Sequence, residues 1–152
     1  MKNVILNLMA YEYWANQRVI GVLETTGNPP EKAVTLMAHI LGAQDVWFNR
    51  MTNNPEPGVS WPQTPVTSLR HLAEKYYTNY TNWLVNLTNE ELITVVTYRN
   101  LQGDGPFQNT MQDILLHLGN HSAYHRGQVI QLLKTVRDDV PATDYIVWKR
   151  EV

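Results

Sequence analysis

Residues 111–136 read MQDILLHLGNHSAYHRGQVIQLLKTV. Apolar or histidine side chains recur every three or four positions, at Ile114, Leu118, His121, His125, Val129, Leu132 and Val136. This spacing places all of them on one face of an α-helix, as on the inward face of a helix in a bundle. Thr110 is the expected N-cap, with Asp113 as a weak capping partner. We therefore predict a long helix over residues 111–136 with one buried face.

Two positions on this buried face are histidines, His121 and His125. At 100° per residue the two side chains lie about 40° apart around the axis and one turn apart along it, so both rings can reach one ion. Buried imidazoles need partners for their nitrogens, and a metal ion satisfies them while selecting the neutral ring. Ser122 stands where zinc hydrolases of the His-Glu-x-x-His type carry their glutamate, which excludes that class of protease.

A third donor is available on the helix predicted over residues 31–51. His39 lies on its inner side, one turn from Leu36 and beside Ile40, and the small residues Gly42 and Ala43 leave room next to the ring. Three histidines with an open position are typical of a catalytic metal site, and bundles build such sites from facing helices. From the residues alone, a metal site and ordinary core packing of these histidines both remain open.

The rest of the chain predicts an all-α four-helix bundle that forms one domain over residues 1–152. Gly27-Asn28-Pro29-Pro30 ends the first helix, and the proline-rich segment 52–65 predicts a surface loop in which Trp61 is a candidate lid residue. The remaining elements are helices over 3–24 and 66–87, and a small β-hairpin or extended segment with strands at 92–98 and 106–108, between the third and fourth helices.

The composition of the chain limits the classes of partner that it is expected to bind. The 152 residues are 43% hydrophobic with a formal charge of −2, which gives no basic surface for nucleic acid. No apolar run approaches the ~20 residues that cross a bilayer, and polar residues interrupt the first segment too early for a signal peptide. We expect a cytoplasmic protein that acts on a small molecule, without nucleic acid or membrane. The absence of cysteine excludes disulfides and thiolate chemistry from the chain itself.

Further residues of the long helix near the two histidines are candidates for a supporting role. His117 lies one turn before His121 but about 80° from His125, so one ion cannot easily take all three, and we interpret His117 as a supporting or packed residue. Gln128 lies one turn beyond His125, and whether it lines the site is left open. Arg126 points about 100° away, which favours an anchor to a neighbouring helix or to a carboxylate.

Glu12 and Asn16 share an apolar stripe of the first predicted helix. A buried carboxylate there could orient a ligand or serve as a base. The plainer interpretation, which we slightly favour, is a polar pair that bridges helices at the surface edge. His71 is expected at the surface, and Gly127 is expected to permit close helix packing.

The segment His121-Ser122-Ala123-Tyr124-His125-Arg126-Gly127-Gln128 closely resembles the His-x-x-x-His-Arg-Gly-Gln signature of the DinB/YfiT-like family of metal-dependent proteins. Other matching features are Tyr13-Trp14-Ala15-Asn16, His39-Ile40 with Trp47, and the ending Pro141-Ala142-Thr143-Asp144-Tyr145. The resemblance covers essentially the whole chain. It implies an up-down-down-up bundle, metal ligands at His39, His121 and His125, zinc or nickel as the metal, and a homodimer.

The same resemblance suggests chemistry. Some relatives use a low-molecular-weight thiol, as transferases or as a maleylpyruvate isomerase, whereas most have no established reaction. We therefore expect a metal-dependent enzyme with open coordination positions, with thiol-dependent transfer ahead of metal-assisted hydrolysis by analogy alone. Any thiol must come from a cofactor or substrate. The alternatives are a non-catalytic, stress-related metal-binding bundle, which the lack of a clear general base favours, and a helical protein without metal.

Overall fold

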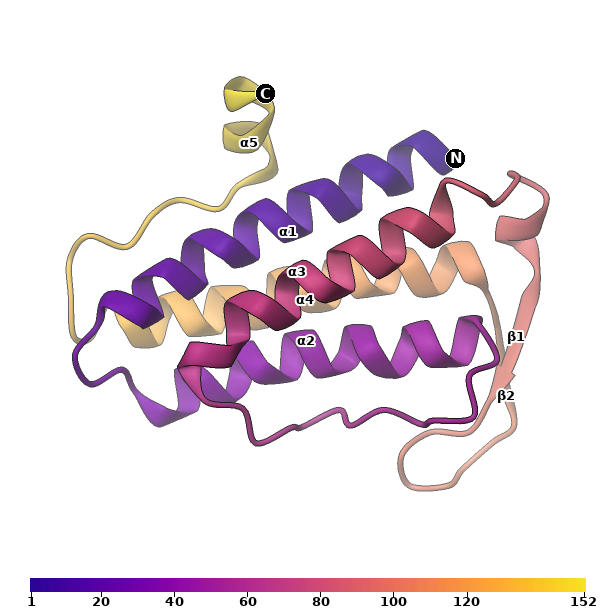
Figure 1. Cartoon of the computed structure of the whole chain (residues 1–152), viewed down its shortest axis with the longest axis horizontal. Coiled ribbons are helices and arrows are strands. Elements are labelled where there is room, and N and C mark those ends of the chain that lie inside the picture. Colours follow the sequence, from indigo (N-terminus) through magenta and orange to yellow (C-terminus); the bar gives the residue numbers. More distant parts are fainter.

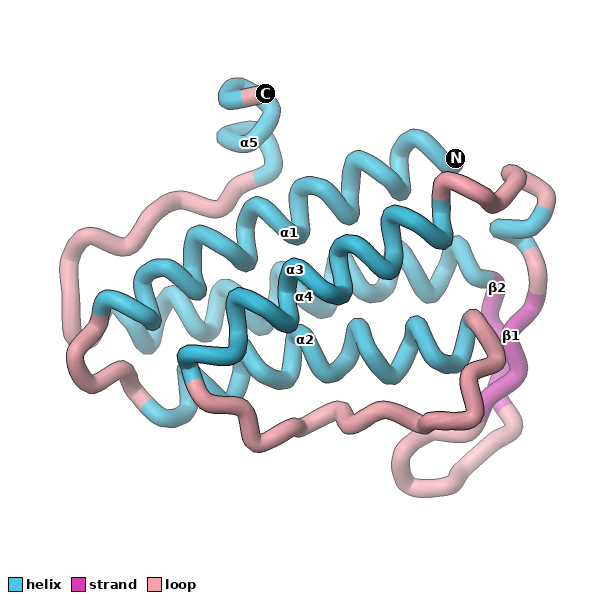
Figure 2. The backbone as a smooth tube through the Cα atoms, viewed as in Figure 1, coloured by secondary structure: helices cyan, strands magenta, loops and turns pink.

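The computed structural model describes residues 1–152, and four long helices dominate it (Figure 1). A short C-terminal helix and a two-stranded antiparallel sheet complete the fold, the sheet lying at one end of the helices (Figure 2). In chain order the elements are α1 (Lys2–Thr25), α2 (Glu31–Met51), α3 (Val66–Leu84), the 3-10 turn η1 (Glu91–Ile93), β1 (Val95–Tyr98), β2 (Phe107–Thr110), α4 (Met111–Leu133) and α5 (Tyr145–Glu151). No helix is long and apolar enough to span a membrane.

The four long helices pack so that α1 contacts α3 and α4, while α2 contacts the same two helices. Their apolar side chains form two separate clusters, one around Ile20 and Met37 and the other around Ile5 and Leu115. Each cluster takes residues from all four helices. Between them lies a group of buried polar side chains that we call the polar layer: Glu12, Asn16, His39, Gln44, Ser122 and Arg126.

The ends of the predicted elements need correction. α3 stops at Leu84 and α4 at Leu133, because from Asn86 and Thr135 onward the amides bond to carbonyls three residues back, as in Val136 N–H to Leu133 O. The first strand begins at Val95 and not at residue 92, because Glu91–Ile93 form the turn η1. The return strand runs from Phe107 to Thr110, pairing Tyr98 with Phe107 and Val95 with Thr110. It begins after Pro106 because proline has no amide to donate to the ladder. Thr110 then caps α4, its side chain accepting the amide of Asp113.

The connection between α2 and α3 runs back along α2 (Figure 2). Gly42 of α2 permits this close approach, since a Cβ at that position would lie 2.5 Å from the carbonyl oxygen of Val59 and 2.7 Å from that of Ser60. Gly58 supports the same path with a positive φ of 70°. Gly127, by contrast, has nothing within 4 Å of such a Cβ, so the expectation of close packing there is wrong.

Candidate metal centre

The structure brings His39 of α2 together with His121 and His125 of α4. One nitrogen of each ring lies within 4.8 Å of those of the other two. The Nε2 atoms of His39 and His121 are 3.1 Å apart. An ion at ~2.0–2.1 Å from both atoms would make an angle of about 100° between them, close to tetrahedral geometry. The arrangement therefore allows one ion to contact imidazoles from both helices.

Hydrogen bonds orient two of the rings. The Nδ1 atom of His39 donates to the carbonyl oxygen of Ser60 at 2.7 Å, and Nδ1 of His125 donates to the side-chain oxygen of Gln128 at 2.8 Å. These bonds fix the proton on Nδ1 and leave the lone pair of Nε2 free for a metal. Nδ1 of His121 is buried without a partner. Two of the three donors are thus prepared in the metal-binding tautomer.

Burial also favours the neutral form of these rings. It lowers the pKa of His121 to about 4, with further lowering from the neighbouring charges of His125, His39 and His117. The pKa of His39 is lowered mainly by burial, against the opposing effect of the Ser60 hydrogen bond. Burial therefore favours the neutral form of both rings, which is the form that binds a metal ion.

The α2–α3 connection covers the ring of His39. The indole of Trp61 stacks on it, with ring centroids 3.6 Å apart and an interplanar angle of 5°. Trp61 keeps half of its own surface exposed, so it lies between the histidines and solvent. Ser60, which fixes the His39 tautomer, was missed by the sequence reasoning because its contact is made by a backbone carbonyl. Its only sequence signal was its position beside Trp61.

His117 lies beside the cluster without joining it. Its ring centroid is 5.5 Å from that of His121 and 5.9 Å from that of Trp47, and burial lowers its pKa. It is absent from the group of donors that can share one ion. His71 is exposed on α3, as predicted.

Arg126 anchors α4 to α1 through a buried ion pair. Its Nη1 and Nη2 atoms donate to the two carboxylate oxygens of Glu12 at 2.9 and 3.0 Å. Nη1 also donates to Asn16 at 2.9 Å, and Nη2 to the hydroxyl of Tyr11 at 3.2 Å. The prediction of a carboxylate partner for Arg126 is confirmed. The favoured placement of Glu12 and Asn16 at the surface edge is wrong, because both are almost completely buried, and neither hydrogen-bonds to the histidines.

A cavity of about 430 Å³ opens beside the histidine cluster, between α2 and the hairpin. Its lining residues are His39, Ala43, Val46, Trp47, Arg50, Ser60, Tyr98, Asn100, Leu101, Gln102, Phe107 and His121. No carboxylate is among them. This cavity gives a small molecule access to two of the three histidines.

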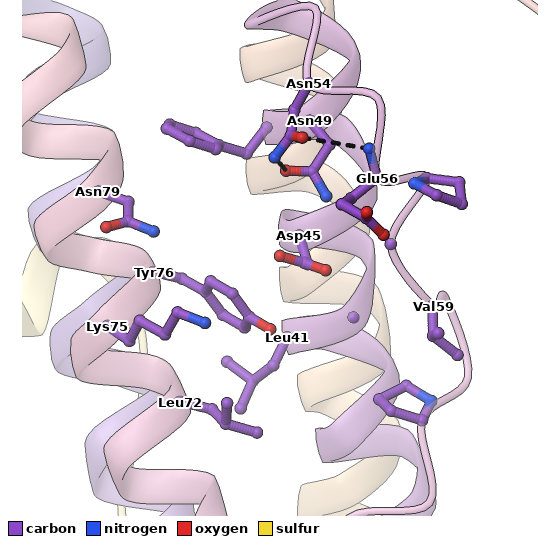
Figure 3. A pocket seen from close by; sticks show the side chains of 15 residues that line it. Leu41, Asp45, Asn49, Asn54, Glu56, Val59, Leu72, Lys75, Tyr76 and Asn79 are labelled. Carbon is purple, nitrogen blue, oxygen red and sulfur yellow. Dashed lines mark hydrogen bonds between the residues drawn. The ribbon is translucent and has the colours of Figure 1, made fainter.

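A larger cavity, of about 600 Å³, lies between α2, the α2–α3 connection and α3 (Figure 3). Asp45 and Glu56 line one side of it, and Lys75 and Tyr76 reach in from α3. It contains no histidine, so its lining does not include the metal-binding group. The smaller cavity is therefore the one relevant to the candidate metal centre.

Packed long helices that bring three imidazoles together from α2 and α4 define a class of helical proteins with a candidate site for a divalent ion. The family model of the DinB family matches residues 1–151, and the chain belongs to this family. No curated protein and no solved structure matches the chain.

Proposed function

We propose that this protein binds one divalent metal ion, zinc or nickel, through His39, His121 and His125. We further propose that it is a metal-dependent enzyme that acts on a small-molecule substrate. The observation that carries the proposal is the convergence of three imidazoles from two helices, with one nitrogen of each within 4.8 Å of the others. Three protein ligands leave coordination positions open, as in catalytic sites. The proposal includes the up-down-down-up order of the long helices and a homodimer, both by analogy with the family.

Within this proposal, thiol-dependent transfer is favoured over hydrolysis. A divalent ion binds sulfur and lowers the pKa of a thiol, so the site needs no side chain to act as a base. Hydrolysis would gain from a carboxylate base, but none lines the cavity, and Glu12 is occupied by Arg126. The thiol loses its proton to solvent, and its sulfur forms a bond to an electrophilic carbon of the second substrate as a leaving group departs with its electron pair.

The chain's own residues hold and shield this site. Ser60 and Gln128 keep the rings of His39 and His125 oriented, and Trp61 covers the His39 ring on the solvent side. Because the chain has no cysteine, no internal thiol competes for the ion. A small external thiol can therefore take an open position.

A second candidate function is a non-catalytic, stress-related metal-binding role. The lack of any carboxylate in the cavity beside the histidines favours it, because a general base is then missing for many reactions. This role keeps the metal ion and its ligands but predicts no turnover of any substrate.

Elemental analysis of tag-free protein tests the metal site. Wild type and His71→Ala, which removes an exposed histidine far from the cluster in the sequence, should retain equal amounts of metal, about one ion per chain. His39→Ala should lose most of it because three donors act together. Equal retention by wild type and His39→Ala would refute the site. A screen of electrophiles with a low-molecular-weight thiol, with and without chelator, then separates the enzyme from the non-catalytic alternative.

A further inference from the structure

Arg50, near the end of α2, is a half-buried cation without an anionic partner. No carboxylate lies within 4 Å of its guanidinium, whereas the four salt bridges of the chain use other residues. Only its Nη2 atom is engaged, donating to the carbonyl oxygen of Arg99 at 2.8 Å. Nε and Nη1 have no acceptor in the protein. The guanidinium therefore has donors to offer to a ligand.

Two aromatic rings hold this guanidinium in place. Its central carbon lies 4.6 Å from the ring centre of Trp47 and 4.9 Å from that of Tyr98. Such cation–π contacts fix the plane of the group while leaving its edges free. Burial lowers the pKa of Arg50, the direction expected for a cation that has lost water without gaining a counter-charge. An anionic ligand would supply that charge.

Arg50 and the metal-binding group face the same cavity. Arg50 is eleven residues after His39, which at 100° per residue returns it to within about 20° of the same helix face, some 16 Å along the axis. The guanidinium lies over Trp47, about one turn nearer to His39 along the helix. Both residues line the 430 Å³ cavity. A ligand several bonds long can therefore touch the ion at one end and Arg50 at the other.

We propose that the substrate of this site is a small organic carboxylate, whose anionic end is bound by Arg50 while its other end lies at the metal ion. This inference rests on the proposed function and names its substrate class. The guanidinium edge matches a carboxylate through two parallel hydrogen bonds. A single cation balances one negative charge, which favours a carboxylate over a doubly charged phosphate ester. The apolar faces of Trp47, Leu101 and Phe107 suit the hydrocarbon body between the two ends.

Isothermal titration of the zinc-loaded protein tests this inference with two matched thiols. The probes are 6-mercaptohexanoate and its neutral counterpart 6-mercaptohexanol, which share the thiol and the chain length. Wild type should bind the carboxylate about tenfold or more tightly than the alcohol, the preference expected for a hydrogen-bonded charge pair. Arg50→Gln should remove the preference while changing the affinity for the alcohol less than about twofold. Arg50→Lys, which keeps the charge without the planar fork, should retain part of it.

Lys75→Gln is the matched control, because Lys75 is the cation of the larger cavity (Figure 3). It should leave the preference unchanged, and a loss there would overturn the inference by placing the carboxylate in the other cavity. A purely structural Arg50 would weaken both probes equally in Arg50→Gln, which also overturns it. If Arg50→Gln does not fold, Arg50→Lys replaces it as the test, and a preference for the carboxylate that stays unchanged in Arg50→Lys also overturns the inference. Zinc bound without any preference overturns this inference alone, whereas failure to bind zinc refutes the proposed function together with it.

Discussion

Replacing Glu12 by glutamine should destabilise the protein far more than its small change in shape suggests. Glu12 and Arg126 expose only 2% and 1% of their side chains, and both carboxylate oxygens accept from the guanidinium. Glutamine keeps the size but removes the charge and turns one acceptor into a donor that faces another donor. Breaking a buried pair in this way costs about 3–5 kcal/mol, because the remaining charge is left without compensation.

The expected loss is large relative to the whole stability of a domain. Typical unfolding free energies are about 5–15 kcal/mol. At about 2–4 °C per kcal/mol for a chain of this size, the thermal midpoint should fall by about 6–20 °C. Urea unfolding of the metal-free protein at pH 7 measures the change directly.

Glu24→Gln is the matched control for this prediction. Glu24 pairs with Arg70 at 2.7 Å, but this pair is substantially exposed, and such pairs contribute about 0–1 kcal/mol. A second test is the double variant Glu12→Leu/Arg126→Met, which removes both charges and should be more stable than Glu12→Gln. A cost of Glu12→Gln no greater than that of Glu24→Gln would refute the reasoning.

Three further predictions concern the metal centre. Gly42→Ala should displace the α2–α3 connection and break the hydrogen bond from His39 to Ser60, and zinc binding should then weaken about 10–100-fold in a chelator competition. Gly127→Ala is the control: it has open space around it and should leave zinc binding unchanged. The metal-free protein should lose stability in urea as pH falls from 6.5 toward 4, because the unfolded chain then protonates His121 while the folded chain, with its pKa of about 4, does not. Zinc at about 100 times its dissociation constant should add about 2.7 kcal/mol to the unfolding free energy. EDTA or His121→Ala should abolish this gain. A gain that survives His121→Ala would contradict the assigned ligands.

The sequence was sufficient for the features that depend on local periodicity. The spacing of three and four residues in 111–136 predicted both the helix and the shared face of His121 and His125, since the helical repeat alone sets that geometry. The position of His39 opposite them required helix packing, which periodicity does not specify, and the family resemblance supplied it. The C-terminal ends of α3 and α4 were each misplaced by three residues because apolar side chains continue into the turn that follows.

Side chains whose role depends on distant partners were the ones misjudged. Glu12 was placed at the surface edge because nothing near it in the chain announces its pairing with Arg126, 114 residues away. Arg50 was not among the predicted site residues, since an arginine near a helix end is usually solvated. Its stacking partner Tyr98 belongs to a strand that reaches Arg50 only in the folded state. Its position as the one cation in the lining of the cavity could not be inferred before the hairpin was placed.

The division of the core by the polar layer has a consequence for the motions of the protein. Because all four long helices contribute to each apolar cluster, the two ends of the molecule are joined by the helix backbones as well as by the polar side chains between them. A cation bound by both α2 and α4 beside that layer would cross-link the two helices. Its binding would slow amide hydrogen exchange toward both ends of the helices, well beyond the residues that bind it.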